Sequence, residues 1–182
     1  MIKASFEALH TSNRQSFLAR KFDEWAYDSP YHFHPEYELT CITKGTGKRY
    51  MGSHMEDFVA GDLILLGPNL PHCWKLTNIE QMQNEAGAIV IQFTEDFLGS
   101  NFWERPELQD LSKLLKRSVT GIRFDGDTQS AANKSIIDLC NDENNFNKLL
   151  KFCSRATGNL FWSGSLTSGN LMARTIFTRN MS

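Results

Sequence analysis

Short stretches in which apolar and polar residues alternate occupy the first half of the chain. A repeat of two residues is typical of β-strands that bury one face. Asn, Pro and Gly punctuate the chain between these stretches. The pattern predicts strands at residues 2–10, 16–27, 31–43, 48–51, 54–59, 63–66, 72–76 and 86–93. So many short strands predict an all-β sandwich or barrel.

The period of the hydrophobic pattern changes after residue 93. Thr94 is in a position to cap a short helix that continues to Phe97. Apolar residues then recur at helical spacing in three further stretches. These predicted helices lie near residues 108–115, 127–140 and 146–153.

A division into three parts follows from these patterns. The barrel is predicted over residues 1–94 and a helical segment over residues 95–153. Residues 154–182 are rich in Ser, Thr, Gly and Asn and hold no period, so we interpret them as an atypical tail. The fold class is therefore all-β with appended helices.

Candidate ligands for a metal ion gather on one face of the strand at residues 31–43. His32, His34 and Glu38 share one parity, so their side chains should project from the same side. His72, after the Gly- and Pro-rich loop of residues 67–71, supplies a fourth candidate. Three imidazoles and a carboxylate suit Zn, Ni, Fe or Mn. The alternative is that the four side chains only hydrogen-bond an organic effector or one another.

Further polar residues share the parity of the histidines and are candidates for binding a small molecule. Glu36, Thr40 and Lys44 lie on the predicted inner face, and Trp74 has the parity of His72. Such a face would suit a sugar or a small polar acid. Ordinary packing of Trp74, a solvated strand end for Lys44 and a rim position for Glu36 beside a proline are the alternatives.

The opposite face of the same strand is apolar, with Phe33, Tyr37, Leu39 and Cys41 in sequence. Four such residues predict a buried face, covered either by a second sheet or by the later helices. Apolar residues of those helices can cover the barrel or form a dimer seam. They are Leu111, Leu115, Phe146, Leu149 and Leu150.

Composition narrows the class of protein. A hydrophobic content of 41% and a charged content of 22% are ordinary for a globular protein, and the net charge is -2. No Lys or Arg stripe suggests nucleic-acid binding. No stretch approaches the roughly 20 apolar residues of a membrane span. The four cysteines form no Cys-x-x-Cys pair and the N-terminus has no apolar run, so we expect reduced thiols and a cytoplasmic protein.

Two motifs resemble those of the cupin superfamily. They read His-x-His-x3-Glu-x6-Gly over residues 32–45 and Gly-x6-Pro-x3-His over residues 61–72. Ala26 and Leu70 stand where the cupin pattern has glycine. The resemblance implies a double-stranded β-helix, a jelly-roll barrel with a metal or ligand inside.

The residues around the two motifs are similar to those of a narrower family, the N-terminal sensing domains of AraC-type bacterial transcription regulators. The stretches are His-Pro-Glu-Tyr-Glu-Leu at residues 34–39 and Gly-Asp-Leu-Ile-Leu-Leu-Gly-Pro-Asn-Leu-Pro-His at residues 61–72. In that family helices for dimerisation follow the barrel, and a double helix-turn-helix module follows the helices. We find no such module in this sequence, so DNA contact is expected only through a module outside it.

The resemblance implies an effector-sensing, dimerising domain that takes a small molecule into its barrel. Binding energy that differs between two arrangements would then shift the helices or an N-terminal arm. The alternative is a metal-dependent cupin enzyme, a dioxygenase or an isomerase, in which the metal polarises substrate or activates oxygen. A structural barrel without ligand fits least, because unpartnered buried His and Glu side chains are costly.

Overall fold

The computed structural model describes residues 3–9, 15–23, 30–77, 86–158 and 173–175. Ala26, the ends of the strands predicted at residues 2–10 and 16–27, and most of the tail at residues 154–182 lie outside these residues.

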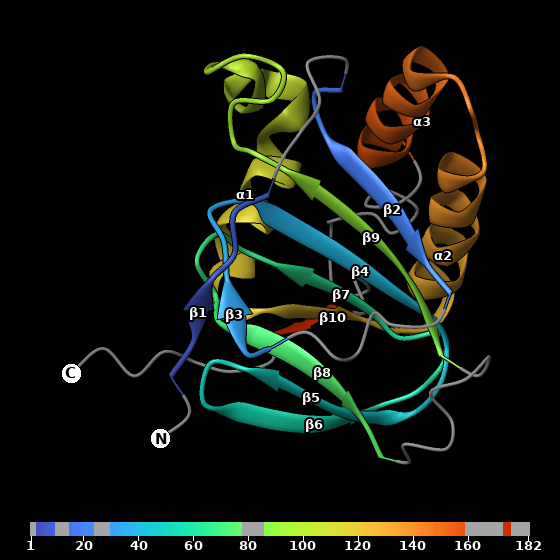
Figure 1. Ribbon diagram of the computed structural model, residues 1–182. Helices are drawn as coiled ribbons and strands as arrows, with labels where there is room; N and C mark the ends of the chain where they lie inside the picture. Colours follow the sequence, from blue (N-terminus) through green and yellow to red (C-terminus); the bar gives the residue numbers. More distant parts are fainter. Residues whose placement is uncertain (1–2, 10–14, 24–29, 78–85, 159–172, 176–182) are drawn as a thin grey trace.

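Two sheets face each other and form the barrel (Figure 1). In spatial order, the five-stranded sheet contains β1 (Ser5–Phe6), β3 (His32–Phe33), β8 (His72–Leu76), β5 (Gly47–Met51) and β6 (His54–Phe58). The six-stranded sheet contains β11 (Ala173–Thr175), β10 (Ile122–Phe124), β7 (Leu63–Leu66), β4 (Tyr37–Lys44), β9 (Gly87–Phe93) and β2 (Leu18–Phe22). All strand pairs are antiparallel except β1 with β3.

The alternation of side chains along β4 places its residues in two separate cores. Ile42 belongs to the core between the two sheets, together with Ile64, Leu66, Phe58 and Trp74. The opposite face belongs to a second core, which also contains the apolar side chains of the helices. Its members from β4 are Tyr37, Leu39 and Cys41. The predicted burial of this apolar face is confirmed for these three residues, with the helices as its cover, whereas Phe33 lies on β3 of the other sheet and is only partly buried.

Within the described residues, three helices and three short 3₁₀ turns come after β9. The turns are η2 (Phe102–Glu104), η3 (Pro106–Leu108) and η4 (Ser118–Thr120), and the helices are α1 (Gln109–Arg117), α2 (Gly126–Cys140) and α3 (Asn145–Gly158). Figure 1 shows α2 and α3 beside the six-stranded sheet. Their inward residues and those of α1 pack on the sheet's outer face, including Leu111, Leu115, Ile136 and Leu139. No helix within the described ranges has the length and apolar content that crossing a membrane requires.

The structure differs from the elements predicted from the sequence in three places. The predicted strand at residues 31–43 is broken around Pro35 into β3 and β4, because proline cannot donate to the strand ladder. The helix predicted from Thr94 to Phe97 is wrong, since these residues form a turn in which the Thr94 hydroxyl donates to Asp96 (2.7 Å). Residues 86–93 do not contain the last strand, because β10 and β11 follow.

Strand β10 is short and lies one strand in from the edge of the six-stranded sheet. Ile122 and Phe124 are fully buried in the outer core, and β10 pairs with both β7 and β11. We therefore expect Phe124→Ala to reduce the free energy of unfolding by about 3–5 kcal/mol, because it removes a buried ring and leaves a cavity. Chemical denaturation measures the change.

The matched control is Val119→Ala, close to Phe124 in sequence but exposed. This change should alter the free energy of unfolding by no more than about 0.5 kcal/mol. Equal effects of the two substitutions would contradict the placement of β10 in the core.

Candidate metal centre

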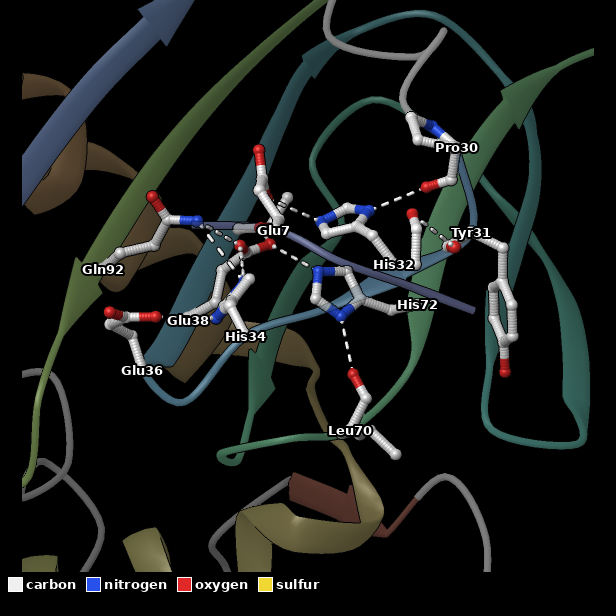
Figure 2. Close-up of polar contacts among 12 residues, drawn as sticks. Glu7, Pro30, Tyr31, His32, His34, Glu36, Glu38, Leu70, His72 and Gln92 are labelled. Carbon is white, nitrogen blue, oxygen red and sulfur yellow. Dashed lines mark hydrogen bonds and ion pairs between the residues drawn. The ribbon is translucent and has the colours of Figure 1, made fainter. Parts of the chain in front are cut away.

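Three strands bring the predicted metal ligands together. His32 on β3 is the register partner of His72 on β8, so the two rings are neighbours in the five-stranded sheet. Glu38 approaches from β4 in the opposite sheet, and His34 lies in the bend between β3 and β4 (Figure 2). Because of the β3–β4 bend, residues of the first motif lie on both sheets and face the same interior.

The three histidine rings form a compact, buried group. The ring centroids of His32 and His72 are 4.4 Å apart, and His34 lies 5.2 Å from His72 and 5.8 Å from His32. One ligand atom from each ring lies within 4.8 Å of the others. All three side chains are buried. The structure thus brings together the three histidines that the spacing predicts.

Two backbone carbonyls fix which ring nitrogen of His32 and His72 faces the cluster. Nδ1 of His32 lies 2.7 Å from the Pro30 carbonyl oxygen, and Nδ1 of His72 lies 2.7 Å from the Leu70 carbonyl oxygen. Since a carbonyl only accepts, each Nδ1 carries the proton and donates it. Nε2 is then the nitrogen available to a cation, as in metal-ligating histidines oriented by a second hydrogen bond.

The Glu38 carboxylate is held by donors from several strands. Thr40 donates its hydroxyl to Oε1 (2.6 Å), and Gln92 donates Nε2 to Oε2 (2.7 Å). Nε2 of His34 lies 3.1 Å from Oε2, and Nε2 of His72 lies 3.6 Å from Oε1. The amide of Gln92 is in turn oriented by Arg20, which donates to its Oε1 (2.5 Å).

The charges of the cluster support one another. Burial opposes ionisation of Glu38, but the charge of His72 and hydrogen bonds from His34 and His72 hold the pKa of this carboxyl well below its usual value. Burial likewise opposes protonation of His72, but Glu38 outweighs it and raises the pKa of His72. Burial and the nearby His72 lower the pKa of His32. The cluster therefore favours one ionised carboxylate with positive charge beside it.

The predicted small-molecule ligands occupy different places. Thr40 and Trp74 are buried, and the indole of Trp74 lies against His72 with the ring centroids 5.5 Å apart. Glu36 is partly buried, with Oε2 3.4 Å from Nδ1 of His34. Lys44 is exposed at the far end of β4. Their roles as ligands stay predictions.

Sequence reasoning missed two side chains that contact the cluster. Gln92 is a polar residue within the otherwise apolar strand β9, and its register with Glu38 on β4 could only be known from the pairing of the strands. Glu7 lies just after β1, and its Oε2 is 3.1 Å from Nε2 of His32. No motif indicates Glu7, because it lies 25 positions before His32, the first residue of the first motif.

The donor set fits a divalent transition metal. Imidazole nitrogens with carboxylate oxygens are the ligands that Zn, Ni, Fe and Mn take in proteins. His32 and His72 are fixed by backbone carbonyls, and Glu38 is fixed by Thr40 and Gln92. Ligands that are oriented in this way are characteristic of metal centres.

Fold and site together define a class: a cupin-type barrel with helices appended and a buried histidine–carboxylate cluster inside. Residues 15–78 match the family model described as the AraC-like ligand binding domain. This match confirms the resemblance to AraC-type sensing domains over those residues. A search of curated protein sequences finds no significant match.

Several solved structures are similar to this chain at low identity. A cupin 2 conserved barrel domain protein from Rhodopseudomonas palustris is 19% identical, with 56% of this chain and 74% of that chain covered and a TM-score of 0.35. ToxT from Vibrio cholerae is 15% identical, with 76% and 54% covered and a TM-score of 0.46. The AraC-like transcriptional activator CuxR is 8% identical, with 77% and 45% covered and a TM-score of 0.43. The chain thus spans about half the length of the two regulators.

The cluster predicts selective metal uptake by the chelator-treated chain. We expect Zn²⁺ to bind near one equivalent in isothermal titration calorimetry. A His34→Ala/Glu38→Ala variant should lose more than about 100-fold in affinity, because the loss of orienting partners alone typically costs 10–100-fold. His54→Ala is the matched control, because His54 lies on β6 and contacts Glu56 instead of the cluster. Equal affinity of the double variant and the wild type would contradict the site.

Proposed function

We propose that this chain is the effector-sensing part of an AraC-type transcription regulator. The observation that carries the proposal is the polar cluster of His32, His34, His72 and Glu38 inside a barrel core that is otherwise largely apolar. Burying such groups is costly unless they are hydrogen-bonded or paired, and an apolar core of the same size would need none of them, which supports a ligand-binding role for the cluster. DNA binding would belong to a module outside this sequence.

Two buried donors beside the cluster support a polar effector. Within the described part of the chain, Nε1 of Trp74 and Nε of Arg49 have no hydrogen-bond acceptor. Arg49 and Trp74 are register partners on β5 and β8, so their side chains share one face of the sheet. Acceptor atoms of an effector would satisfy both donors.

The charge around Arg49 indicates which chemical groups of an effector could lie beside it. Its guanidinium already pairs with the buried Asp62 (2.8 Å) and with Glu56. A hydroxyl-rich sugar therefore suits this wall of the barrel, whereas the carboxylate of a small polar acid would suit the histidine side. The wall with Arg49 therefore supports a sugar as effector, and the side with the histidines supports a small polar acid.

A bound metal would be held by His32, His34, Glu38 and His72. It would act as a Lewis acid toward an effector oxygen and so add binding energy to the hydrogen bonds of the barrel. The chain's own residues set its position: Pro30 and Leu70 orient two rings, and Thr40 and Gln92 orient the carboxylate. Zn, Ni, Fe and Mn all suit this set.

Dimerisation through α3 is part of the proposal. Leu111 and Leu115 are buried against the barrel, but Phe146 and Leu150 on α3 are 66% and 51% exposed. They are four residues apart and therefore adjacent on the helix surface. A groove of about 190 Å³ runs beside them, lined in part by Phe17, Ala19 and Leu149. Exposed apolar patches of this kind typically mark protein–protein contacts.

The second candidate is a metal-dependent cupin enzyme, and the observation that favours it is the position of Glu36. Its carboxylate lies 3.4 Å from His34 at the edge of the cluster, where a general acid or base would be needed. Near-stoichiometric iron or manganese in the purified chain, with oxygen uptake that Glu36→Gln abolishes, would favour the enzyme over the sensor.

The effector proposal predicts that Trp74→Phe weakens binding, because it keeps a ring but removes the Nε1 donor. In a thermal-shift screen of sugars and small acids, we expect at least one compound to stabilise the wild type. Its dissociation constant should rise about tenfold in the variant, the value of one hydrogen bond to a buried donor. Trp103→Phe is the matched control, because the Trp103 donor bonds to the Glu95 carbonyl outside the barrel interior. If Trp74→Phe and wild type bind alike, Trp74 does not contact the effector.

The dimer proposal predicts that Phe146→Ser/Leu150→Ser converts a dimer into a monomer in analytical ultracentrifugation. The control is Met55→Ser/Val59→Ser, which changes two exposed apolar residues at the β6 hairpin. A wild type that is monomeric at every concentration, or a variant that remains dimeric, would contradict an interface on α3.

A further inference from the structure

The N-terminal strand is attached to the barrel next to the histidine cluster. Strand β1 pairs in parallel with β3, so Ser5 is the register partner of His32. The backbone N–H of Ser5 donates to the Tyr31 carbonyl (2.9 Å), and that of Glu7 donates to the Phe33 carbonyl (3.0 Å). The strand is only two residues long, and Phe6 is 62% exposed although its ring contacts Phe33. This attachment has little buried surface of its own, so its stability depends on local contacts.

One of those contacts joins the strand directly to the cluster. Figure 2 shows the Glu7 carboxylate directed at the ring of His32, with Oε2 3.1 Å from Nε2. Since Nδ1 of His32 donates to Pro30, Nε2 of the neutral ring is an acceptor. A carboxylate oxygen is an acceptor too. The carboxylate oxygen thus lies beside the ring nitrogen that faces the cluster, where both atoms can bind one cation, either a proton or a metal ion.

We propose that Glu7 is a further ligand of a metal held by the cluster, and that the metal thereby fastens strand β1 to the barrel. The inference rests on the metal site of the proposed function and adds its regulation. Glu7 lies outside both sequence motifs, and its carboxylate is directed at His32 from just after strand β1 (Figure 2). Its side chain is 42% exposed, so it can leave the site without leaving a buried charge behind.

Metal binding and the docking of strand β1 are thermodynamically linked through this contact. If the metal binds more tightly when β1 is docked, then β1 must dock more tightly, by the same factor, when the metal is bound. Loss of the metal, or its transfer to an effector, would leave β1 held by its backbone hydrogen bonds, by the bond from the Ser5 hydroxyl to Tyr31 and by one ring contact. Whether the buried site holds a metal would then determine whether the exposed strand β1 is docked or released.

Amide exchange of the strand and metal affinity test the inference together. The amides of Ser5 and Glu7 report docking, because they donate to Tyr31 and Phe33. In the chelator-treated wild type, we expect Zn²⁺ to slow their exchange roughly tenfold, within the usual range of coupling between sites. In Glu7→Gln this protection should disappear, and the Zn²⁺ affinity should fall by a similar factor.

Controls separate this inference from the proposed function. Glu104→Gln makes the same chemical change at an exposed position on η2 and should behave as wild type. If Glu7→Gln keeps both full affinity and full protection, Glu7 is no ligand and the inference fails while the metal site stands. If the wild type binds Zn²⁺ without protecting Ser5 and Glu7, the coupling fails. If the wild type binds no Zn²⁺, the metal site itself fails, and effector binding in the thermal-shift screen remains a separate test.

Discussion

The burial of one carboxylate sets the conditions for the rest of the barrel interior. Glu38 is 3% exposed, and an ionised group at such depth is tolerated only when hydrogen bonds and opposite charge surround it. Its donors come from β4, β8, β9 and the β3–β4 bend, so the two sheets must meet in one register for the carboxylate to be satisfied. The apolar cores make the barrel stable, but the cluster selects how its strands align.

Motif spacing was enough to select the four residues of the cluster, His32, His34, Glu38 and His72. The parity argument assumed one continuous strand, whereas the chain bends at Pro35 and places His32 and Glu38 in opposite sheets. Lys44 has the same parity, but β4 continues beyond the interior and its last residue is exposed. Gln92 and Glu7 depend on which strands pair, and that information is not local.

Strand β4 explains how one sequence can serve two layers. Glu38 and Thr40 face the interior with Ile42, whereas Tyr37, Leu39 and Cys41 pack under the helices. The helices were predicted from their own period, yet their burial on this sheet could not be separated from a dimer seam by sequence alone. In the structure Leu111 and Leu115 are buried, whereas Phe146 and Leu150 are exposed, so of these four residues only the latter two are accessible for the proposed dimer contact.

The late position of β10 in the chain has a consequence for how the molecule is assembled. Strand β7 ends at Leu66, yet its partner residues Ile122 and Phe124 are synthesised more than 50 residues later. During translation β7 therefore has an unpaired, wholly apolar edge of the kind that pairs with other chains. Closing the sheet needs a contact between distant segments, which slows folding. The emerging barrel thus passes through an aggregation-prone interval that ends only when residue 124 has left the ribosome.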